Sequence, residues 1–249
     1  MLVFLVFVSA CDPAVEAPPD SRQPIAEHRD PNATLEHDAN RVTNRGNDSQ
    51  GAAASTAVRV ERARIVAFGD SLTAGLGVPP AQTYPAHLQR RLDQAGYHIQ
   101  VINAGVSGET SAGGLRRVDW VLKSDPDLVI LELGGNDGLR GIDPKETRGN
   151  LEQIIKRFQA EEVPVILAGM KLPPNYGEEF TSRFAAIYPD LAQSYRLPLM
   201  PFFLEDVALQ DELTQADGIH PTGDGYRVIV ENLFPVLEPL LKEIPHAAS

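Results

Sequence analysis

Two short polar segments, far apart in the chain, carry side chains suited to nucleophilic catalysis. Ser71 follows Gly69-Asp70 and an apolar run at residues 65–68, whereas Asp217 precedes His220 by three positions near the other end. A serine hydroxyl becomes an effective nucleophile when a base takes its proton, and a carboxylate can orient that base and stabilise its charged form. These residue types therefore predict acyl chemistry, with Ser71 as nucleophile, His220 as base and Asp217 as orienting acid.

His220 is the histidine best placed for this role, because it lies in the loop sequence Asp217-Gly218-Ile219-His220-Pro221. One tight loop can hold an acid and a base three residues apart, and the proline keeps His220 out of helical geometry. The other histidines lie in the amino-terminal extension, early in a predicted helix or strand, or in the carboxyl-terminal tail: His28, His37, His87, His98 and His246.

Both segments also have a purely structural explanation. Asp70 or Ser71 can cap a following helix, because both side chains accept hydrogen bonds from free backbone N–H groups. Asp217 and His220 can be solvated residues of a turn that begins a helix. The local sequence leaves these alternatives open.

Two further glycine-rich turns supply donors for the negative charge that develops during acyl transfer. They follow the second and third predicted strands, at residues 105–108 and 134–138. We expect the Asn136 side-chain amide and the backbone N–H groups of Ser71 and Gly105 to face this oxyanion. Asn136 also belongs to Asn-Asp-Gly, a favoured turn tripeptide, and Gly105 can be required only for a positive φ angle, so structural alternatives remain.

A parallel sheet is needed to bring these turns together. Apolar runs alternate with segments of helical periodicity, which predicts a three-layer α/β/α sandwich with five parallel strands. The flavodoxin-like order 2-1-3-4-5 sets strands one and three side by side, and so places Ser71 close to Asn136. Predicted strands cover residues 65–68, 98–102, 128–131, 163–168 and 197–200; predicted helices cover 83–95, 111–123, 144–160, 178–195 and 224–242.

Length and composition limit the number of domains and the kind of partner. The 249 residues are 43% hydrophobic and include 20 glycines and 20 prolines, enough for one sizeable core and some unstructured length. We expect one catalytic domain at residues 62–245 and a monomer. The 34 acidic and 22 basic residues give a formal charge of −12, which repels phosphate backbones and argues against nucleic acid as a partner.

The amino-terminal 61 residues indicate where in the cell the protein is located and do not predict a folded domain. An apolar run at residues 2–8 is too short for a membrane span of roughly 20 residues. Val8-Ser9-Ala10-Cys11 resembles a bacterial lipobox, which implies cleavage before Cys11, a lipid on its sulfur and contact with a membrane of the cell envelope. A free apolar tail or a plain secretory signal is the alternative. Residues 12–61 have the composition of a disordered tether or of an ordinary linker.

Four sequence blocks together resemble those of the GDSL, or SGNH, hydrolases. They are Gly69-Asp70-Ser71-Leu72, Gly105, Gly134-Gly135-Asn136-Asp137 and Asp217-Gly218-Ile219-His220-Pro221, and the resemblance covers residues 64–243. It is strongest to the arylesterase and thioesterase I/lysophospholipase L1 branch. The resemblance implies the SGNH hydrolase fold, the catalytic residues Ser71, Asp217 and His220, and an oxyanion hole of Ser71, Gly105 and Asn136. It also implies small ester or lipid substrates, possible thioester cleavage, and no metal or cofactor.

Residues 169–177 are similar to the mobile loop beside the acyl groove in such thioesterases. The similarity implies substrate contacts from Pro174, Asn175 and Tyr176, although the segment can also be a plain Pro/Gly-rich connection. Family members often have an arginine where this chain has Lys171. Two other functions use the same residues: an envelope-polymer deacetylase or acyltransferase, and an inactive lipid-anchored binding module.

Overall fold

The computed structural model describes residues 62–244 and 247. The predictions for the apolar amino-terminal segment, Cys11 and the tether fall on residues 1–61 and lie outside the described residues. In the described part, no helix is both long enough and apolar enough to cross a membrane.

The centre of the fold is a five-stranded parallel sheet in the order β2-β1-β3-β4-β5, as the sequence predicted. Its inner strands β1, β3 and β4 are almost wholly buried, whereas the edge strand β2 is partly exposed. A sheet covered on both faces needs such continuous apolar runs. The strands are β1 (Ala63–Gly69), β2 (Ile99–Gly105), β3 (Leu128–Glu132), β4 (Val165–Ala168) and β5 (Leu199–Met200).

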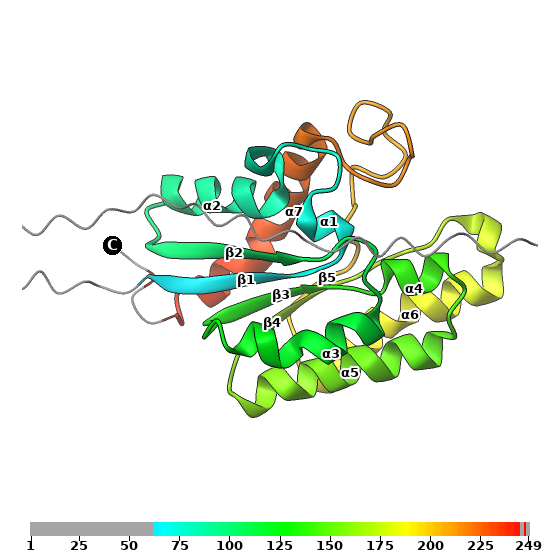
Figure 1. Cartoon of the computed structure of the whole chain (residues 1–249), viewed down its shortest axis with the longest axis horizontal. Helices are drawn as coiled ribbons and strands as arrows, with labels where there is room; N and C mark the ends of the chain where they lie inside the picture. The colour runs from blue at the N-terminus through cyan, green and yellow to red at the C-terminus, as the bar shows by residue number, and fades with distance from the viewer. Residues whose placement is uncertain (1–61, 245–246, 248–249) are drawn as a thin grey trace, which may run out of the picture. The chain divides into compact units, whose positions relative to one another are not determined.

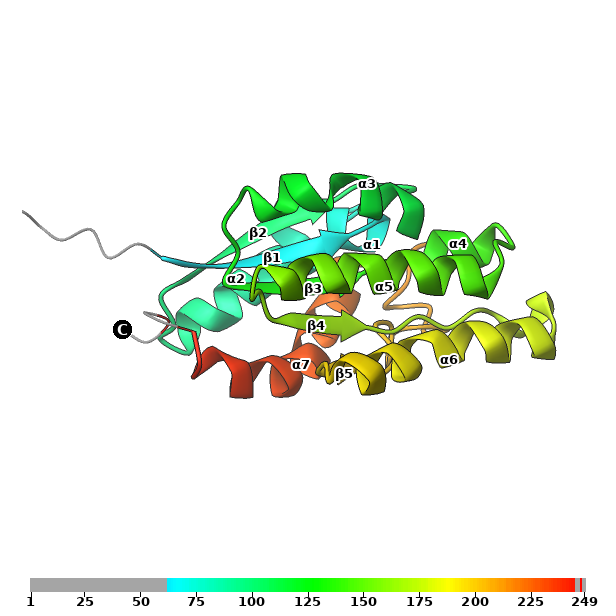
Figure 2. The ribbon, with the colours of Figure 1, turned by 90° about the horizontal axis from the view of Figure 1, so that it is seen from below.

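Helices cover both faces of this sheet and complete the three-layer sandwich. In Figure 1, α2 and α7 lie on one side of the strands and α3, α5 and α6 on the other. Figure 2 shows these last three helices side by side across their face. The helices are α1 (Ser71–Ala74), α2 (Tyr84–Gln94), α3 (Ser111–Leu122), α4 (Gly135–Leu139), α5 (Pro144–Ala160), α6 (Glu178–Tyr195) and α7 (Gly223–Leu241), with 3₁₀ turns at Pro80–Gln82 and Pro174–Tyr176.

Local sequence explains where the longer helices begin. Thr83 caps α2, Asp143 caps α5 and Thr222 caps α7, each by accepting a hydrogen bond from a backbone N–H of the first turn. Such caps satisfy donors that have no partner inside the helix. The five long helices begin and end within two residues of the positions predicted from periodicity, including α6, which has no side-chain cap.

The structure corrects the sequence prediction at two turns beside the strand ends. The segments after β1 and β3 are the short helices α1 and α4 rather than open turns. Asp70 caps α1, so the capping alternative is realised together with the placement of Ser71 at the strand end. The second strand also runs on to Gly105, and the fifth is reduced to two residues after Pro198, because proline cannot donate to a strand ladder.

Candidate active site

Ser71 lies at the carboxyl edge of the sheet, in the first residue of α1. The helix begins directly after β1, and the Asp70 side chain accepts the Leu72 N–H at 3.0 Å. Ser71 is 8% exposed, so it is buried but not fully closed off from solvent. This is the edge where open parallel sheets place their ligand-binding residues.

The three predicted catalytic side chains form one chain of hydrogen bonds. Ser71 Oγ lies 2.8 Å from His220 Nε2, and His220 Nδ1 lies 2.6 Å from Asp217 Oδ2. Both separations suit proton transfer from the hydroxyl to the imidazole and charge stabilisation by the carboxylate. The structure thus brings together residues 149 positions apart in the sequence.

Backbone and side-chain contacts hold the loop that carries His220. Asp217 Oδ1 accepts the N–H groups of Ile219 and His220, and the His220 carbonyl accepts the Gln215 N–H at 2.7 Å. The Gln215 side chain then donates to the Leu76 carbonyl at 2.7 Å, just beyond α1. Gln215 therefore links the loop of the base to the segment after the nucleophile, a role that no local sequence signal indicated.

Asp217 is an anion suited to orienting His220. Its partial burial raises its pKa, but the N–H groups of His220 and Ile219 and the His220 ring outweigh this and lower the pKa of Asp217 to about 2. Hydrogen bonds to the charged form cause this net decrease. Asp217 consequently carries its negative charge across the whole range in which an imidazole titrates.

Asn136 lies at the start of α4 and contacts the residue before the nucleophile. Its Nδ2 donates to Asp70 Oδ2 at 2.8 Å, which leaves the second N–H of the same amide without a partner among the described residues. The backbone N–H of Ser71 also donates to no atom of the described chain. Two of the three predicted oxyanion donors are therefore near one another and free.

The structure does not support Gly105 as the third donor. Its N–H donates to the Asn103 side chain at 2.9 Å, so this group is already engaged. Gly105 does not have the positive φ of the structural alternative either; a Cβ there would lie 2.1 Å from Ala74 N. Glycine is thus needed at position 105 for the close approach of α1 to β2.

Gly108, in the same loop, has the free N–H that Gly105 lacks. Its N–H has no partner in residues 62–244, and its φ of 77° requires a glycine. Arg140 Nη2 donates to the Gly108 carbonyl at 2.9 Å, and Arg117 binds both Glu109 and the Gly69 carbonyl. The two arginines hold this loop against β1 and α4. Gly108 belongs to the predicted turn at residues 105–108 but was not among the predicted oxyanion donors.

Two buried carboxyl groups lie directly behind the nucleophile. Glu132, at the end of β3, is fully buried; its Oε2 accepts the Thr73 hydroxyl at 2.8 Å and lies 3.4 Å from Asp70 N. Burial raises the pKa of Asp70 to about 6, against the N–H groups of Leu72 and Asn136. Burial, and then the charge of Asp70, raise the pKa of Glu132 well above its ordinary value. Glu132 was missed from the sequence, although an acid ending an apolar strand is an unusual pattern.

The loop with the predicted substrate contacts lies against α4. Tyr176 donates its hydroxyl to the Leu139 carbonyl at 3.1 Å and stacks on Phe180 with ring centroids 6.5 Å apart. Pro174 and Asn175 are exposed. The loop therefore adjoins the helix that carries Asn136, while its contact with substrate stays a prediction.

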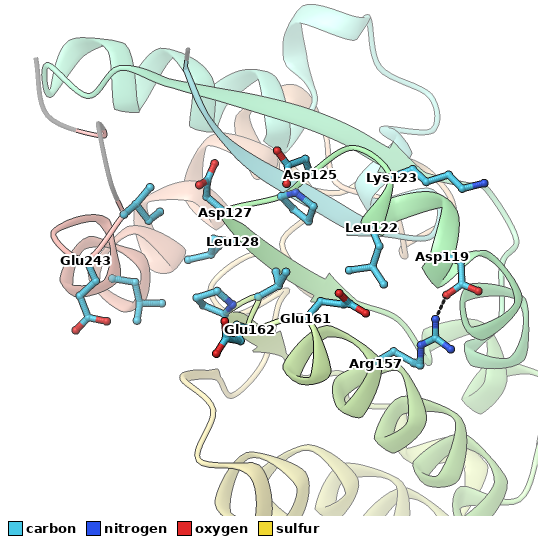
Figure 3. A pocket seen from close by; sticks show the side chains of 15 residues that line it. Asp119, Leu122, Lys123, Asp125, Asp127, Leu128, Arg157, Glu161, Glu162 and Glu243 are labelled. Atoms are coloured by element: carbon cyan, nitrogen blue, oxygen red, sulfur yellow. Dashed lines mark hydrogen bonds and ion pairs between the residues drawn. The ribbon is translucent and has the colours of Figure 1, made fainter. Parts of the chain in front are cut away.

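A hollow of about 660 Å³ lies at the opposite edge of the sheet and includes none of these residues. It is lined by residues just before β3 and β4 and by the ends of α3, α5 and α7. Figure 3 shows its charged side chains, with Arg157 bonded to Asp119. In the described residues, no group of three His, Cys, Asp or Glu side chains is arranged to hold a metal ion, here or elsewhere.

Known proteins are similar to this chain in sequence and in fold. The model of the GDSL-like Lipase/Acylhydrolase family matches residues 67–228. The chain is 44% identical over 178 residues to Esterase TesA of Pseudomonas aeruginosa, across 71% of this chain and 89% of that protein. It is 40% identical over 178 residues to Thioesterase 1/protease 1/lysophospholipase L1 of Escherichia coli K12, across 71% and 84%. The crystal structure of AlinE4, an SGNH-hydrolase family esterase, matches with a TM-score of 0.62 at 46% identity, across 74% of this chain and 98% of that one.

Proposed function

Because this chain belongs to the GDSL-like lipase/acylhydrolase family, we propose that it hydrolyses carboxylic esters through Ser71, His220 and Asp217. The chain is a carboxylic ester hydrolase, as are its relatives named esterase, arylesterase and thioesterase/lysophospholipase. The observation that carries the residue assignment is the hydrogen-bonded series from Ser71 Oγ through the His220 ring to Asp217.

The reaction proceeds in two halves. His220 Nε2 takes the proton of Ser71 Oγ as this oxygen attacks the acyl carbon, and Asp217 stabilises the imidazolium. His220 then protonates the leaving alcohol, and an acyl-serine remains. Water, deprotonated by His220, attacks the acyl-serine and releases the acid. These steps use only groups of the chain and water.

The oxyanion of each tetrahedral intermediate accepts hydrogen bonds from Ser71 N, the Asn136 amide and Gly108 N. Gly108 replaces Gly105 in this assignment because its N–H is not engaged by another residue. A crystal structure of a phosphonate adduct on Ser71 checks the choice. The phosphonyl oxygen should lie about 2.7–3.1 Å from Gly108 N; the same distance to Gly105 N instead would restore the original prediction.

Apolar side chains around the site favour an apolar acyl group. Leu76, Val106 and Ile219 are between 39% and 47% exposed, and each lies within a few residues of a catalytic or oxyanion residue. Rates on p-nitrophenyl esters of two to sixteen carbons test this. If these side chains bind the acyl chain, kcat/KM should rise by up to about fourfold for each added CH₂ over the first part of the series. A flat series would contradict acyl binding there.

Labelling with a fluorophosphonate distinguishes the enzyme from an inactive binding module. The probe should attach to Ser71, identified by peptide mass spectrometry, and the label should disappear in Ser71→Ala. An unlabelled, folded wild-type protein would end the proposal. Product analysis with sugar acceptors separates hydrolysis from acyl transfer to an envelope polymer.

An envelope location through a lipid on Cys11 is part of the same proposal. Its support is the sequence Val8-Ser9-Ala10-Cys11 alone, since these residues are not among those the structure describes. Mass spectrometry of the mature amino terminus should find a diacylglyceryl group on Cys11. An unmodified Cys11 would leave only a secretory signal or a free tail. The monomer prediction is checked by light scattering of the purified chain.

A further inference from the structure

Asp70 lies between the nucleophile and the first turn of α4, and is 2% exposed. Each of its carboxylate oxygens accepts one N–H: Oδ1 that of Leu72 at 3.0 Å, and Oδ2 that of the Asn136 side chain at 2.8 Å. In the proposed mechanism Ser71 is the nucleophile, but Asp70 has no role. Burying a carboxylate costs desolvation free energy unless hydrogen bonds compensate for it, so the hydrogen bonds of Asp70 call for a functional or structural reason.

The second contact determines how the Asn136 amide is oriented. A carboxylate only accepts hydrogen bonds, so the amide atom that faces Asp70 Oδ2 must be the nitrogen and not the oxygen. An amide group is planar, so binding one N–H fixes the direction of the other. Without Asp70, the same side chain can turn its carbonyl oxygen toward the site, where it would repel an oxyanion.

We propose that Asp70 is a positioning residue of the oxyanion hole, which holds the Asn136 amide nitrogen so that its second N–H donates to the oxyanion formed at Ser71. The inference rests on the proposed function and extends it to a residue outside the hydrogen-bonded series of Ser71, His220 and Asp217. A charge-assisted hydrogen bond in a buried site is stronger than a neutral one. Asp70 can therefore hold the amide in place before substrate binds.

An amide at position 70 cannot replace the carboxylate. Asn has one acceptor oxygen, whereas Leu72 N and Asn136 Nδ2 need two. Burial raises the pKa of Asp70 to about 6, so Asp70 is ionised at pH 8. Titratable groups from several elements interact electrostatically with Asp70 or Glu132. They are Tyr84, Asp137, Tyr188, His220 and Tyr226.

The competing explanation is that Asp70 serves only as the cap of α1. Asp70→Ser separates the two roles, because a serine hydroxyl can accept the Leu72 N–H but is too short to reach Asn136. If capping were the whole role, Asp70→Ser would keep kcat near that of the wild type.

The decisive experiment is a double-mutant cycle on the full chain at pH 8, with a p-nitrophenyl ester as substrate. Asp70→Asn, Asp70→Ser and Asn136→Ala should each lower kcat by roughly 10²–10³, with KM changed by less than about threefold. The double variant Asp70→Asn/Asn136→Ala should lose no more than about threefold beyond Asn136→Ala alone, because both changes remove the same donor. Asp190→Asn, an exposed acid of α6, is the matched control and should equal the wild type.

Two results would overturn the inference. One is a decrease in kcat of the double variant that equals the product of the two single decreases; the other is a kcat of Asp70→Asn within about threefold of the wild type. Fluorophosphonate labelling of the wild type at Ser71 keeps this failure separate from failure of the proposed function. If the Asp70 variants do not fold, hydrogen exchange in the wild type decides. One Asn136 side-chain proton should exchange at least about tenfold more slowly than the other; equal, fast exchange of both would refute the contact.

Discussion

The two edges of the sheet both carry many charged side chains but hold them in different ways. At the carboxyl edge, Asp70 and Glu132 are buried and bonded to N–H and O–H donors. At the amino edge, the pair Arg157 and Asp119 is 52% and 64% exposed. Exposed pairs contribute little because water already solvates both charges, whereas buried carboxyl groups are costly without specific partners. Buried and bonded polar groups therefore identify the site better than the size of a hollow does.

The largest difference between the edges should come from removing the nucleophile. Ser71→Ala is expected to lower kcat on an aryl ester by about 10⁶-fold, because among the described residues only the Ser71 hydroxyl is hydrogen-bonded to His220 Nε2. The melting curve should change little, since the lost group is one hydroxyl. Stopped-flow traces check this: a burst of p-nitrophenol from the variant would contradict the assignment.

Asn136→Ala should have the next largest effect. Loss of one oxyanion donor lowers kcat by roughly 10²–10³. Because the variant keeps Ser71, His220 and Asp217, slow labelling by a fluorophosphonate should persist. Steady-state kinetics give the value, and a decrease of less than about threefold would reduce Asn136 to a helix-start residue.

The buried acid at the carboxyl edge should make stability depend on pH. Since burial and Asp70 raise the pKa of Glu132 above its ordinary value of 4.5, the folded state keeps a proton that the unfolded chain releases. Its contribution is full below about pH 4.5 and is lost as the pH rises through the folded pKa. Glu132→Gln lacks this titration. As the pH rises, the free energy of unfolding of the variant should therefore increase relative to that of the wild type, by at most about 1.4 kcal/mol per pH unit.

Urea unfolding of both proteins between pH 5 and pH 8 measures that difference. Parallel curves would mean that Glu132 is ionised in the fold, contrary to the direction derived from its burial. Glu161→Gln, an exposed acid at the amino edge, is the matched control and should follow the wild type.

The smallest effect is expected at the amino edge itself. Glu162 lines the hollow and has a positive φ of 57°, which asparagine tolerates better than glutamate. Glu162→Asn should leave kcat/KM within about twofold and the free energy of unfolding within about 0.5 kcal/mol. A large loss of turnover would show that this edge takes part in catalysis and would break the comparison.

Much of the architecture could be predicted because it depends on local patterns. Apolar runs marked the strands, and apolar periodicity marked α2, α3, α5, α6 and α7 within two residues. The short helices α1 and α4 were missed because four or five residues carry no period to detect. Gly105 was chosen over Gly108 because sequence shows which glycines end a strand but not which N–H another side chain occupies.

By itself, the sequence determined the parallel sheet and marked Ser71 and the loop of Asp217 and His220 as candidates for the nucleophile and the acid–base pair, because residue type and short-range spacing are written along the chain. Only the tertiary structure decided which groups meet. The contact of Ser71 with His220 spans 149 positions and that of Asp70 with Asn136 spans 66. The packing of α1 against β2 and the burial of Glu132 likewise depend on distant segments. Such contacts and pKa shifts arise from the shared removal of water, which no local stretch of sequence can specify.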